Sequence, residues 1–315
     1  MLVSIASLRQ PTYKSELSHP RMPEQSILDY LDDELAERAY LVRRKIKIAA
    51  KAAREDHGET ACLFFTLPEF FWNIPWHAVR SEEELHALNS AYLTKVPECV
   101  ALLIGELPVE QYGKIVLLAG SCAVLIKVGE GESSYYDVIN CLLTITNKEY
   151  EVDTPLMSMW PKRYVSGIDF GRHVGSKDGY WFFKLFDEKV VKVKKTSSVR
   201  AEHSYFGGYE GIFINSLVVG CPFGINLCLD YAVLKDGERD KEIELAGAKI
   251  DFLIACGMDF DYSKRHPSSL QYAIRNDGMG EGECEVVKLE AGRILGGVPG
   301  AVIDDSLHLT AIHIA

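Results

Sequence analysis

The chain has no run of apolar residues long enough to cross a bilayer, so nothing in it predicts a transmembrane segment. Its first stretch, MLVSIASLRQPTYK, lacks both the basic start and the apolar length of a secretion signal, and we expect a cytoplasmic protein. The eight cysteines form no CxxC pair and no dense cluster. In a chain of this size that spacing is typical of a reducing compartment.

Several catalytic signatures are also missing. The sequence contains no HExxH, no GxSxG and no P-loop. The glycines of DGMGEGE (277–283) do not follow a predicted strand, as a dinucleotide-binding loop would. His308 and His313 are five positions apart, so in a strand they point to opposite faces and do not predict a metal site.

Basic residues are fewer than acidic ones, 34 against 45, which gives a formal net charge of -11. Nucleic acids and anionic membrane surfaces are therefore not expected as the principal partners, and a small-molecule substrate is favoured. One basic cluster stands apart, in KLFDEKVVKVKK (184–195). We interpret it as the solvated side of an edge hairpin, where lysines discourage strand pairing between molecules, although it could also meet an acidic partner.

The 315 residues, 47% hydrophobic and 25% charged, fit an ordinary globular protein, and no linker divides residues 1–315 into separate domains. Apolar residues recur every three or four positions from Ser26 to Arg54 and predict a helix. SEEE at Ser81 supplies the N-cap and first-turn acids of a second helical region, which extends to Ile104.

Strand-like apolar runs alternate with these helices. We predict strands at 2–7, 61–67, 114–128, 138–145, 217–231, 250–257, 284–292, 301–305 and 307–315. Residues 235–249 are predicted to be helical, 268–277 to be helix or loop, and 164–204 to be an inserted loop with a hairpin. The alternation of strand and helix predicts a layered α/β architecture with a mixed sheet.

Three polar residues stand next to predicted strands. Glu69 follows an apolar strand and a proline in LFFTLPEFFW, where burial would raise its pKa and suit it to act as a general base. Lys162 lies in MWPKRY, and Cys228 in GCPFGINLCLDY. Taken alone, each has a plainer interpretation: a solvent-facing acid, a solvated lysine and a buried cysteine that fills the core. A lysine near Cys228 would lower the pKa of the thiol and hold an oxyanion.

The order of these placements, LPE after a strand, a lysine after a later strand and GINLC before LD, resembles the nitrilase or carbon–nitrogen hydrolase superfamily. The resemblance covers most of the chain. SIASLRQP (4–11) is similar to the family's first strand, residues 26–54 to its first helix, and Asn140 to its strand-opening asparagine. LAGAKIDFLIACG (245–257) is similar to the helix-to-strand step after the nucleophile. The fold that the resemblance implies is a four-layer α-β-β-α sandwich with mixed sheets.

The resemblance also implies roles for residues. Glu69 would be the general base, Cys228 the nucleophile, and Lys162 with the backbone N–H of Leu229 would bind the oxyanion. Glu202, before a Tyr-Phe pair, matches a second glutamate of the N-carbamoyl amino acid amidohydrolase branch, with a loop acid as the alternative. The remaining cysteines are interpreted as core residues: Cys62, Cys99, Cys122, Cys141, Cys221, Cys256 and Cys284.

The activity expected from the resemblance is hydrolysis of a C–N bond in a small linear amide or carbamoyl compound through a thioester, without a metal or organic cofactor. Asp230, two residues after the cysteine, leans toward the amidase-like branches. Nitrilase activity and a non-catalytic binding or assembly protein of the same fold remain as alternatives. By resemblance we also expect a homo-oligomer, a dimer or larger.

Overall fold

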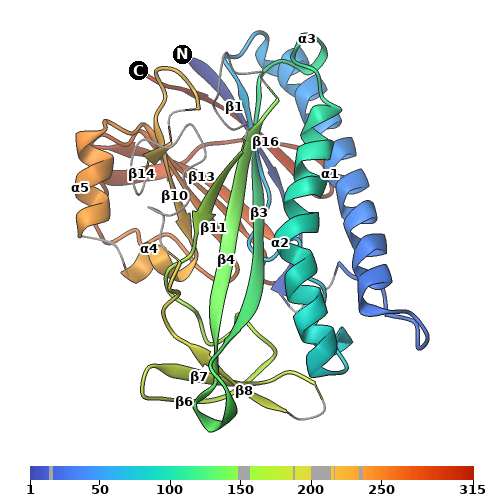
Figure 1. Cartoon of the computed structure of the whole chain (residues 1–315). Helices are drawn as coiled ribbons and strands as arrows, with labels where there is room; N and C mark the ends of the chain where they lie inside the picture. Colours follow the sequence, from blue (N-terminus) through green and yellow to red (C-terminus); the bar gives the residue numbers. More distant parts are fainter. Residues whose placement is uncertain (14–16, 148–156, 187–188, 200–213, 216, 234–236) are drawn as a thin grey trace.

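The structure is a computed structural model that describes residues 1–13, 17–147, 157–186, 189–199, 214–215, 217–233 and 237–315. Two β-sheets pack face to face, with α1 and α2 covering the outer face of one sheet and α5 lying outside the other (Figure 1). This arrangement confirms the predicted four-layer α-β-β-α sandwich with mixed sheets. The helices are α1 (Ile27–His57), α2 (Glu82–Gly105), α3 (Val109–Tyr112), α4 (Leu229–Val233) and α5 (Glu238–Leu245), with 3-10 turns at Trp76–Ala78 and Gly131–Ser133.

The larger sheet runs in the order β15-β16-β1-β2-β3-β4-β8-β7-β6, and β5 also pairs with β4. Its central strands β1, β2 and β3 are parallel, whereas β4 is antiparallel to β3. Its strands are β1 (Leu2–Leu8), β2 (Leu63–Thr66), β3 (Ile115–Val128), β4 (Tyr135–Thr146), β5 (Met157–Pro161), β6 (Arg172–Lys177), β7 (Tyr180–Lys184), β8 (Val190–Lys194), β15 (Ala301–Asp304) and β16 (Leu307–His313).

The smaller sheet runs in the order β14-β13-β12-β11-β10-β9. Here β10, β11 and β12 are parallel. Its strands are β9 (Ile214–Asn215), β10 (Phe223–Leu227), β11 (Ile250–Ala255), β12 (Tyr272–Asp277), β13 (Glu283–Glu290) and β14 (Arg293–Gly297). The parallel strands of each sheet end at one edge of that sheet, and the loop after β2 of the larger sheet hydrogen-bonds to the end of β11 in the smaller one.

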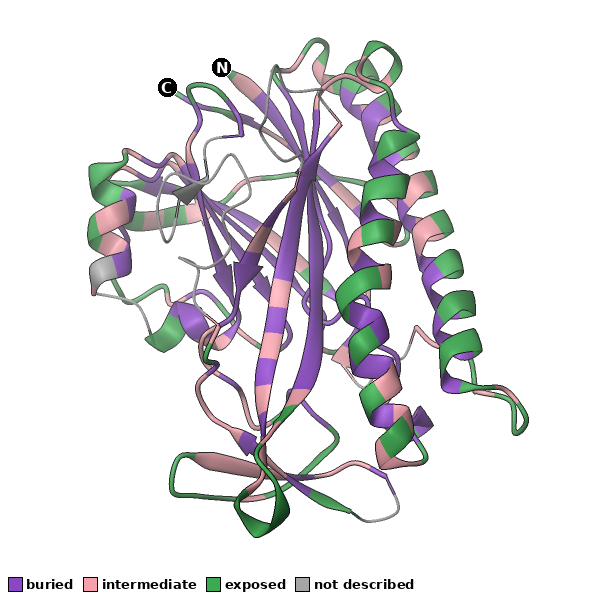
Figure 2. Ribbon diagram, in the orientation of Figure 1, coloured by how far each residue is buried: buried purple, intermediate pink, exposed green. Residues whose placement is uncertain are grey.

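Two cores hold these layers together. One lies between the helices α1 and α2 and the larger sheet, and the other fills the space between the two sheets. Phe64 of β2 contacts both Phe223 of β10 and Phe252 of β11, with ring centroids 5.1 Å apart in each pair. Figure 2 shows the central strands almost wholly buried, whereas α1 and α2 alternate buried and exposed residues along their length. The predicted helices at 26–54 and from Ser81 are confirmed, and the side chain of Ser81 caps α2 by accepting from the backbone N–H of Glu84.

Several predictions were wrong. Residues 217–231 are not one strand, because only Phe223–Leu227 is extended and α4 begins at Leu229. Within 268–277, residues Tyr272–Asp277 form β12, so the glycines from Gly278 do follow a strand. The described part of residues 164–204, predicted to be a loop with a hairpin, contains the strands β6 to β8, and β8 is a neighbour of β4 rather than an edge strand. β5 and β14 were not predicted.

Candidate active site

Glu69 lies in the loop that follows β2, at the junction of the two sheets. Its backbone N–H donates to the carbonyl of Ala255 in the smaller sheet, 3.3 Å away, and its carbonyl accepts a 2.6 Å hydrogen bond from the hydroxyl of Thr12. Phe70, next in the chain, has a positive φ of 62° and donates its N–H to Ser121 Oγ. The carboxylate is fully buried and its backbone is fixed from both sheets.

The rest of this loop is held by buried side chains. The guanidinium of Arg38, on α1, donates to the carbonyls of Phe71 and Asn73 at 2.7 and 2.8 Å. The indole N–H of Trp72 donates to the carbonyl of Ala119 at 2.6 Å. These bonds satisfy backbone groups that the loop leaves without a β-ladder partner, and so they keep Glu69 in one position.

Cys228 occupies the sharp turn between β10 and α4. Its φ is 44°, a left-handed conformation that a residue with a Cβ rarely adopts. Its N–H donates to the carbonyl of Ile254, and its Sγ lies 3.7 Å from the carbonyl oxygen of Cys256. The charge of the Glu69 carboxylate acts on this thiol and raises its pKa, and Oε2 of Glu69 is buried without a hydrogen-bond partner among the described residues. A strained strand-to-helix turn is a recurrent way to present a nucleophile, although strain alone assigns no function.

Lys162 follows β5 directly. Its Nζ lies 2.8 Å from Oε1 of Glu69 and 2.8 Å from Oδ2 of Asp169, and all three side chains are buried. Asn140, in the middle of β4, donates its Nδ2 to the same Oε1 at 3.0 Å, while its carbonyl accepts the N–H of Lys162 at 2.7 Å. The structure therefore brings the three predicted residues Glu69, Lys162 and Cys228 together.

Two aspartates support the site in ways that the sequence did not reveal. Asp169 gives Lys162 a second carboxylate, and its Oδ2 also accepts the N–H of Ser166. Asp230, two residues beyond Cys228, accepts the backbone N–H groups of Arg163 and Tyr164 at 2.8 and 2.9 Å. Asp230 thus ties the turn that carries the thiol to the loop that carries the ammonium. Asp169 lies in the glycine-rich stretch that we had predicted to be an inserted loop, where no periodic pattern marks it.

The protonation states follow from burial and from the neighbouring charges. Burial raises the pKa of Glu69 to about 7; Lys162 opposes this rise and Asp169 adds to it. Burial disfavours the charged form of Lys162, but the carboxylates of Asp169 and Glu69 outweigh it and raise the pKa of the ammonium. Burial, then the charge of Glu69, raises the pKa of the Cys228 thiol, although Lys162 acts in the opposite direction. Lys162 thus lowers the pKa of the thiol, as expected, but burial and the carboxylates of Glu69 and Asp169 outweigh it in the resting site.

This arrangement can move a proton from sulfur to oxygen next to a fixed positive charge. A neutral thiol near a buried carboxylate can lose its proton to that carboxylate when the sulfur attacks an electrophile. Two of the three N–H donors of Lys162 are used by carboxylates, which leaves one for a substrate oxygen. Leu229, whose N–H we had assigned to the oxyanion, is the first residue of α4 and directly follows the thiol.

Other predicted features fall outside this cluster. Glu202 lies outside the described residues. Cys62, Cys122, Cys221 and Cys256 are buried, as predicted, whereas Cys99, Cys141 and Cys284 are only partly so. Within the described part of the chain, no group of three or more histidine, cysteine, aspartate or glutamate side chains could hold a metal ion. None of the helices described here combines the length and apolar character needed to span a bilayer.

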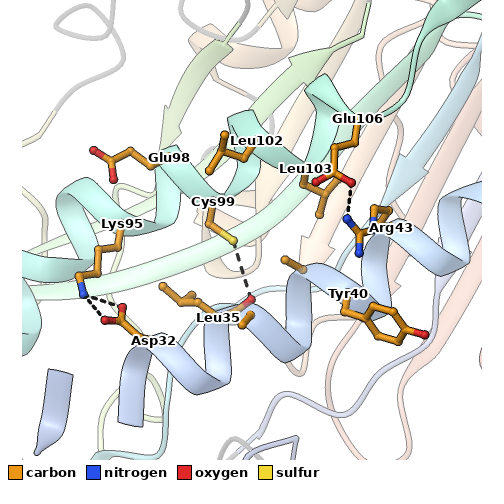
Figure 3. A pocket seen from close by; sticks show the side chains of 12 residues that line it. Asp32, Leu35, Tyr40, Arg43, Lys95, Glu98, Cys99, Leu102, Leu103 and Glu106 are labelled. Atoms are coloured by element: carbon orange, nitrogen blue, oxygen red, sulfur yellow. Dashed lines mark hydrogen bonds and ion pairs between the residues drawn. The ribbon is translucent and has the colours of Figure 1, made fainter. Parts of the chain in front are cut away.

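A groove of about 420 Å³ lies between α1 and α2 and is a different feature (Figure 3). In it the thiol of Cys99 points toward the carbonyl of Leu35, 3.8 Å away, and ion pairs join Lys95 to Asp32 and Arg43 to Glu106. The groove is lined by none of Glu69, Lys162 and Cys228, so it is not the candidate active site.

The chain is similar in fold to several solved structures. A carbon-nitrogen hydrolase from Helicobacter pylori G27 is 12% identical, with a TM-score of 0.44 over 98% of this chain and 88% of that one. A glutamine-dependent NAD(+) synthetase from Cytophaga hutchinsonii is 11% identical, with a TM-score of 0.38 over 99% of this chain and 42% of that one. An N-terminal amidase is 8% identical, with a TM-score of 0.31 over 81% of this chain and 48% of that one.

This chain thus spans less than half of the synthetase and amidase chains, and the likeness concerns the fold alone. No family model matches the sequence, and no curated protein matches it either. The chemistry of the site must therefore be argued from the geometry of its own side chains.

Proposed function

We propose that the chain is a carbon–nitrogen hydrolase of the nitrilase superfamily that cleaves a non-peptide C–N bond in a small linear amide or carbamoyl compound. One observation carries the proposal: a buried carboxylate pairs with an ammonium through one oxygen and leaves the other without a hydrogen-bond partner among the described residues, while a buried thiol within reach of its charge stands on a strained turn between a strand and a helix. Burying an ion pair and a thiol together is costly for stability, which favours a catalytic role over a structural one.

In this mechanism the ionised Glu69 removes the proton from Cys228 as Sγ bonds to the carbonyl carbon of the substrate. The carbonyl oxygen becomes an oxyanion, held by the remaining N–H of Lys162 and the backbone N–H of Leu229. The protonated Glu69 then gives its proton to the departing nitrogen, and ammonia or an amine leaves. Glu69 next takes a proton from water, the hydroxide attacks the thioester, and the acid and the thiol are released.

Asp169 and Asp230 act as positioning residues in the proposed enzyme. Asp169 keeps Lys162 charged, and Asp230 fixes the backbone that follows Lys162. We further propose that residues 1–315 form one hydrolase domain, that it works in the cytoplasm, and that it assembles as a dimer or a larger homo-oligomer. The backbone groups around the site belong to both sheets, so the sheets must stay packed for the site to exist.

The test is ammonia release from a panel of amides, ureido acids and nitriles, with the wild type and with Cys228→Ala. We expect release from an amide or ureido compound, a loss of roughly 10³-fold or more in Cys228→Ala, and an acyl adduct on Cys228 in mass spectra of the wild type. Cys221→Ala, which removes another buried thiol on the same segment, is the matched control and should retain activity. Release from nitriles alone would indicate a nitrilase, and no release above Cys228→Ala from any substrate class would contradict the proposal.

A further inference from the structure

A second cavity lies on the side of β4 that faces α2. It has a volume of about 180 Å³, is partly open to solvent beside the exposed Leu93, and lies between Val96 and Pro97 of α2 and the larger sheet, which contributes Cys122 and Cys141. Its described lining contains no charged side chain. The hydroxyl of Tyr92, a polar group on its wall, already accepts the N–H of Ile74 at 2.7 Å.

The local sequence explains why space remains here. Cys122 and Cys141 are directly opposite each other on the antiparallel strands β3 and β4, so two small side chains meet where larger ones surround them. Above them, Pro97 lies inside α2 and has no N–H to donate to the carbonyl of Leu93. Burial raises the pKa of Cys141 to about 12 and also raises that of Cys122, so both thiols are uncharged at neutral pH.

We propose that this cavity binds a small, neutral, single-ring aromatic molecule between α2 and the sheet. An apolar cavity of about 150 Å³ in another protein stays dry and takes up benzene, so the volume here suits one ring. The sulfurs of Cys122, Cys141 and Met159 line the site, and sulfur makes favourable contacts with aromatic rings. A charged ligand would lose its hydration without gaining a partner.

The cavity lies directly behind the candidate active site. On β4, Cys141 lines the cavity, and its neighbour Asn140 reaches the carboxylate of Glu69 from the opposite face of the strand. On β5, Pro161 lines the cavity and Lys162 follows it. A bound ring therefore packs against the strands that hold Asn140 and Lys162. An effect on turnover would depend on the proposed function, but binding itself does not.

The direct test is xenon, which enters apolar cavities of this kind. Crystals of the full chain are pressurised with xenon, and anomalous scattering locates the atoms. We expect one site between Val96 and Cys141, and its loss in Val96→Phe, which fills the cavity. If Val96→Phe does not fold, Ile139→Phe fills the same space from a half-exposed position. The proposal would be overturned if no xenon signal appeared in the cavity. It would also be overturned if the signal were equally strong in a folded variant whose cavity is filled by phenylalanine.

The test in solution uses benzene and the thiols. Benzene should raise the Tm by about 1–3 °C and slow alkylation of Cys141 several-fold at alkaline pH. Cys99, likewise a partly buried thiol, lies in the groove between α1 and α2; it is the matched control and should be alkylated at an unchanged rate. A specific site would be contradicted if benzene protected both thiols equally or did not protect Cys141. It would also be contradicted if benzene raised the Tm of Val96→Phe as much as that of the wild type. Because no readout requires hydrolysis, failure here and failure of the proposed function are separate outcomes.

Discussion

Asp169 and Lys162 form an ion pair closed to solvent, with Oδ2 of the aspartate 2.8 Å from Nζ of the lysine. The same ammonium is 2.8 Å from Glu69, so one positive charge serves two carboxylates. An excess negative charge in a buried site favours proton uptake, and Asp169 accordingly contributes to the raised pKa of Glu69. The pair therefore governs the pH at which the proposed base becomes available.

Replacing Asp169 with asparagine should move the pH profile. In the wild type, Glu69 must be ionised to accept the thiol proton, so kcat/KM should rise with pH through about 7. Asp169→Asn removes a negative charge and lowers the pKa of Glu69, so the midpoint should move to lower pH, while kcat falls because Lys162 loses a partner. Profiles from about pH 5 to about pH 9 measure this. Asp32→Asn, on an exposed ion pair of α1, should leave the midpoint unchanged. A midpoint that stays in place in Asp169→Asn would exclude this electrostatic coupling.

Glu69→Gln should separate thiol reactivity from catalysis. The charge of Glu69 helps to raise the pKa of Cys228, so removing it should increase the thiolate fraction. We expect iodoacetamide to label Cys228 faster in Glu69→Gln than in the wild type, while ammonia release falls by about 10²-fold or more because the base is gone. Peptide mapping with time gives both labelling rates. Slower labelling in Glu69→Gln would mean that Glu69 activates the resting thiol directly.

This result bears on how slow labelling of the wild type is interpreted. Lys162 lowers the pKa of the Cys228 thiol, but burial and Glu69 raise it by more. The proton is then transferred only when a substrate is in place. Slow alkylation of the free protein is therefore compatible with an active enzyme and does not identify a non-catalytic one.

The positions of Glu69, Lys162 and Cys228 could be proposed from sequence because each stands in an aromatic or apolar context and matches a family order. Asp169 could not, because GIDFG has no periodicity and the aspartate gains its role only through contact with Lys162. The same reason explains why the residues of β12 were predicted to be helix or loop. Its polar side chains find partners outside the strand: Asn276 donates to the carbonyl of Thr66, far away in the chain, and Arg275 donates to Glu283 on the neighbouring strand. Local patterns reveal burial, and they do not reveal which distant group compensates a buried polar side chain.

Asp230 should make stability depend on pH. Burial raises its pKa from 3.8 to about 6 despite the two N–H groups that it accepts. The folded state therefore binds more protons than the unfolded state between these values, and this group makes the free energy of unfolding fall as pH rises through that window. Asp230→Asn should remove about 2–3 kcal/mol of that fall, because each pKa unit corresponds to about 1.4 kcal/mol. Urea titrations of both proteins near pH 4 and pH 6.5 measure the difference. If the free energy of unfolding changes equally with pH in both proteins, then Asp230 is as easily ionised in the folded chain as in the unfolded one.

Gly278→Ala should disturb the site from a distance. A Cβ at Gly278 would lie 1.8 Å from Oγ1 of Thr12, whose hydroxyl holds the carbonyl of Glu69 at 2.6 Å. Thr12 must then move, so we expect a loss of about 1–3 kcal/mol in stability and a lower kcat. Gly105→Ala, at the end of α2 with nothing within 4 Å of the added Cβ, is the matched control and should be neutral or stabilising.

A double variant separates the two effects. Adding Thr12→Ala to Gly278→Ala removes the oxygen that the new methyl group would meet, so stability should recover in part. Activity should not recover, because the hydroxyl that fixes the Glu69 backbone is also gone. Urea unfolding and kcat, measured on the single and double variants, resolve the two. If Gly278→Ala is as stable and as active as Gly105→Ala, then the contact between Thr12 and Gly278 does not constrain Glu69, and the loop after β2 is held by its other hydrogen bonds, among them those of Arg38 and Trp72.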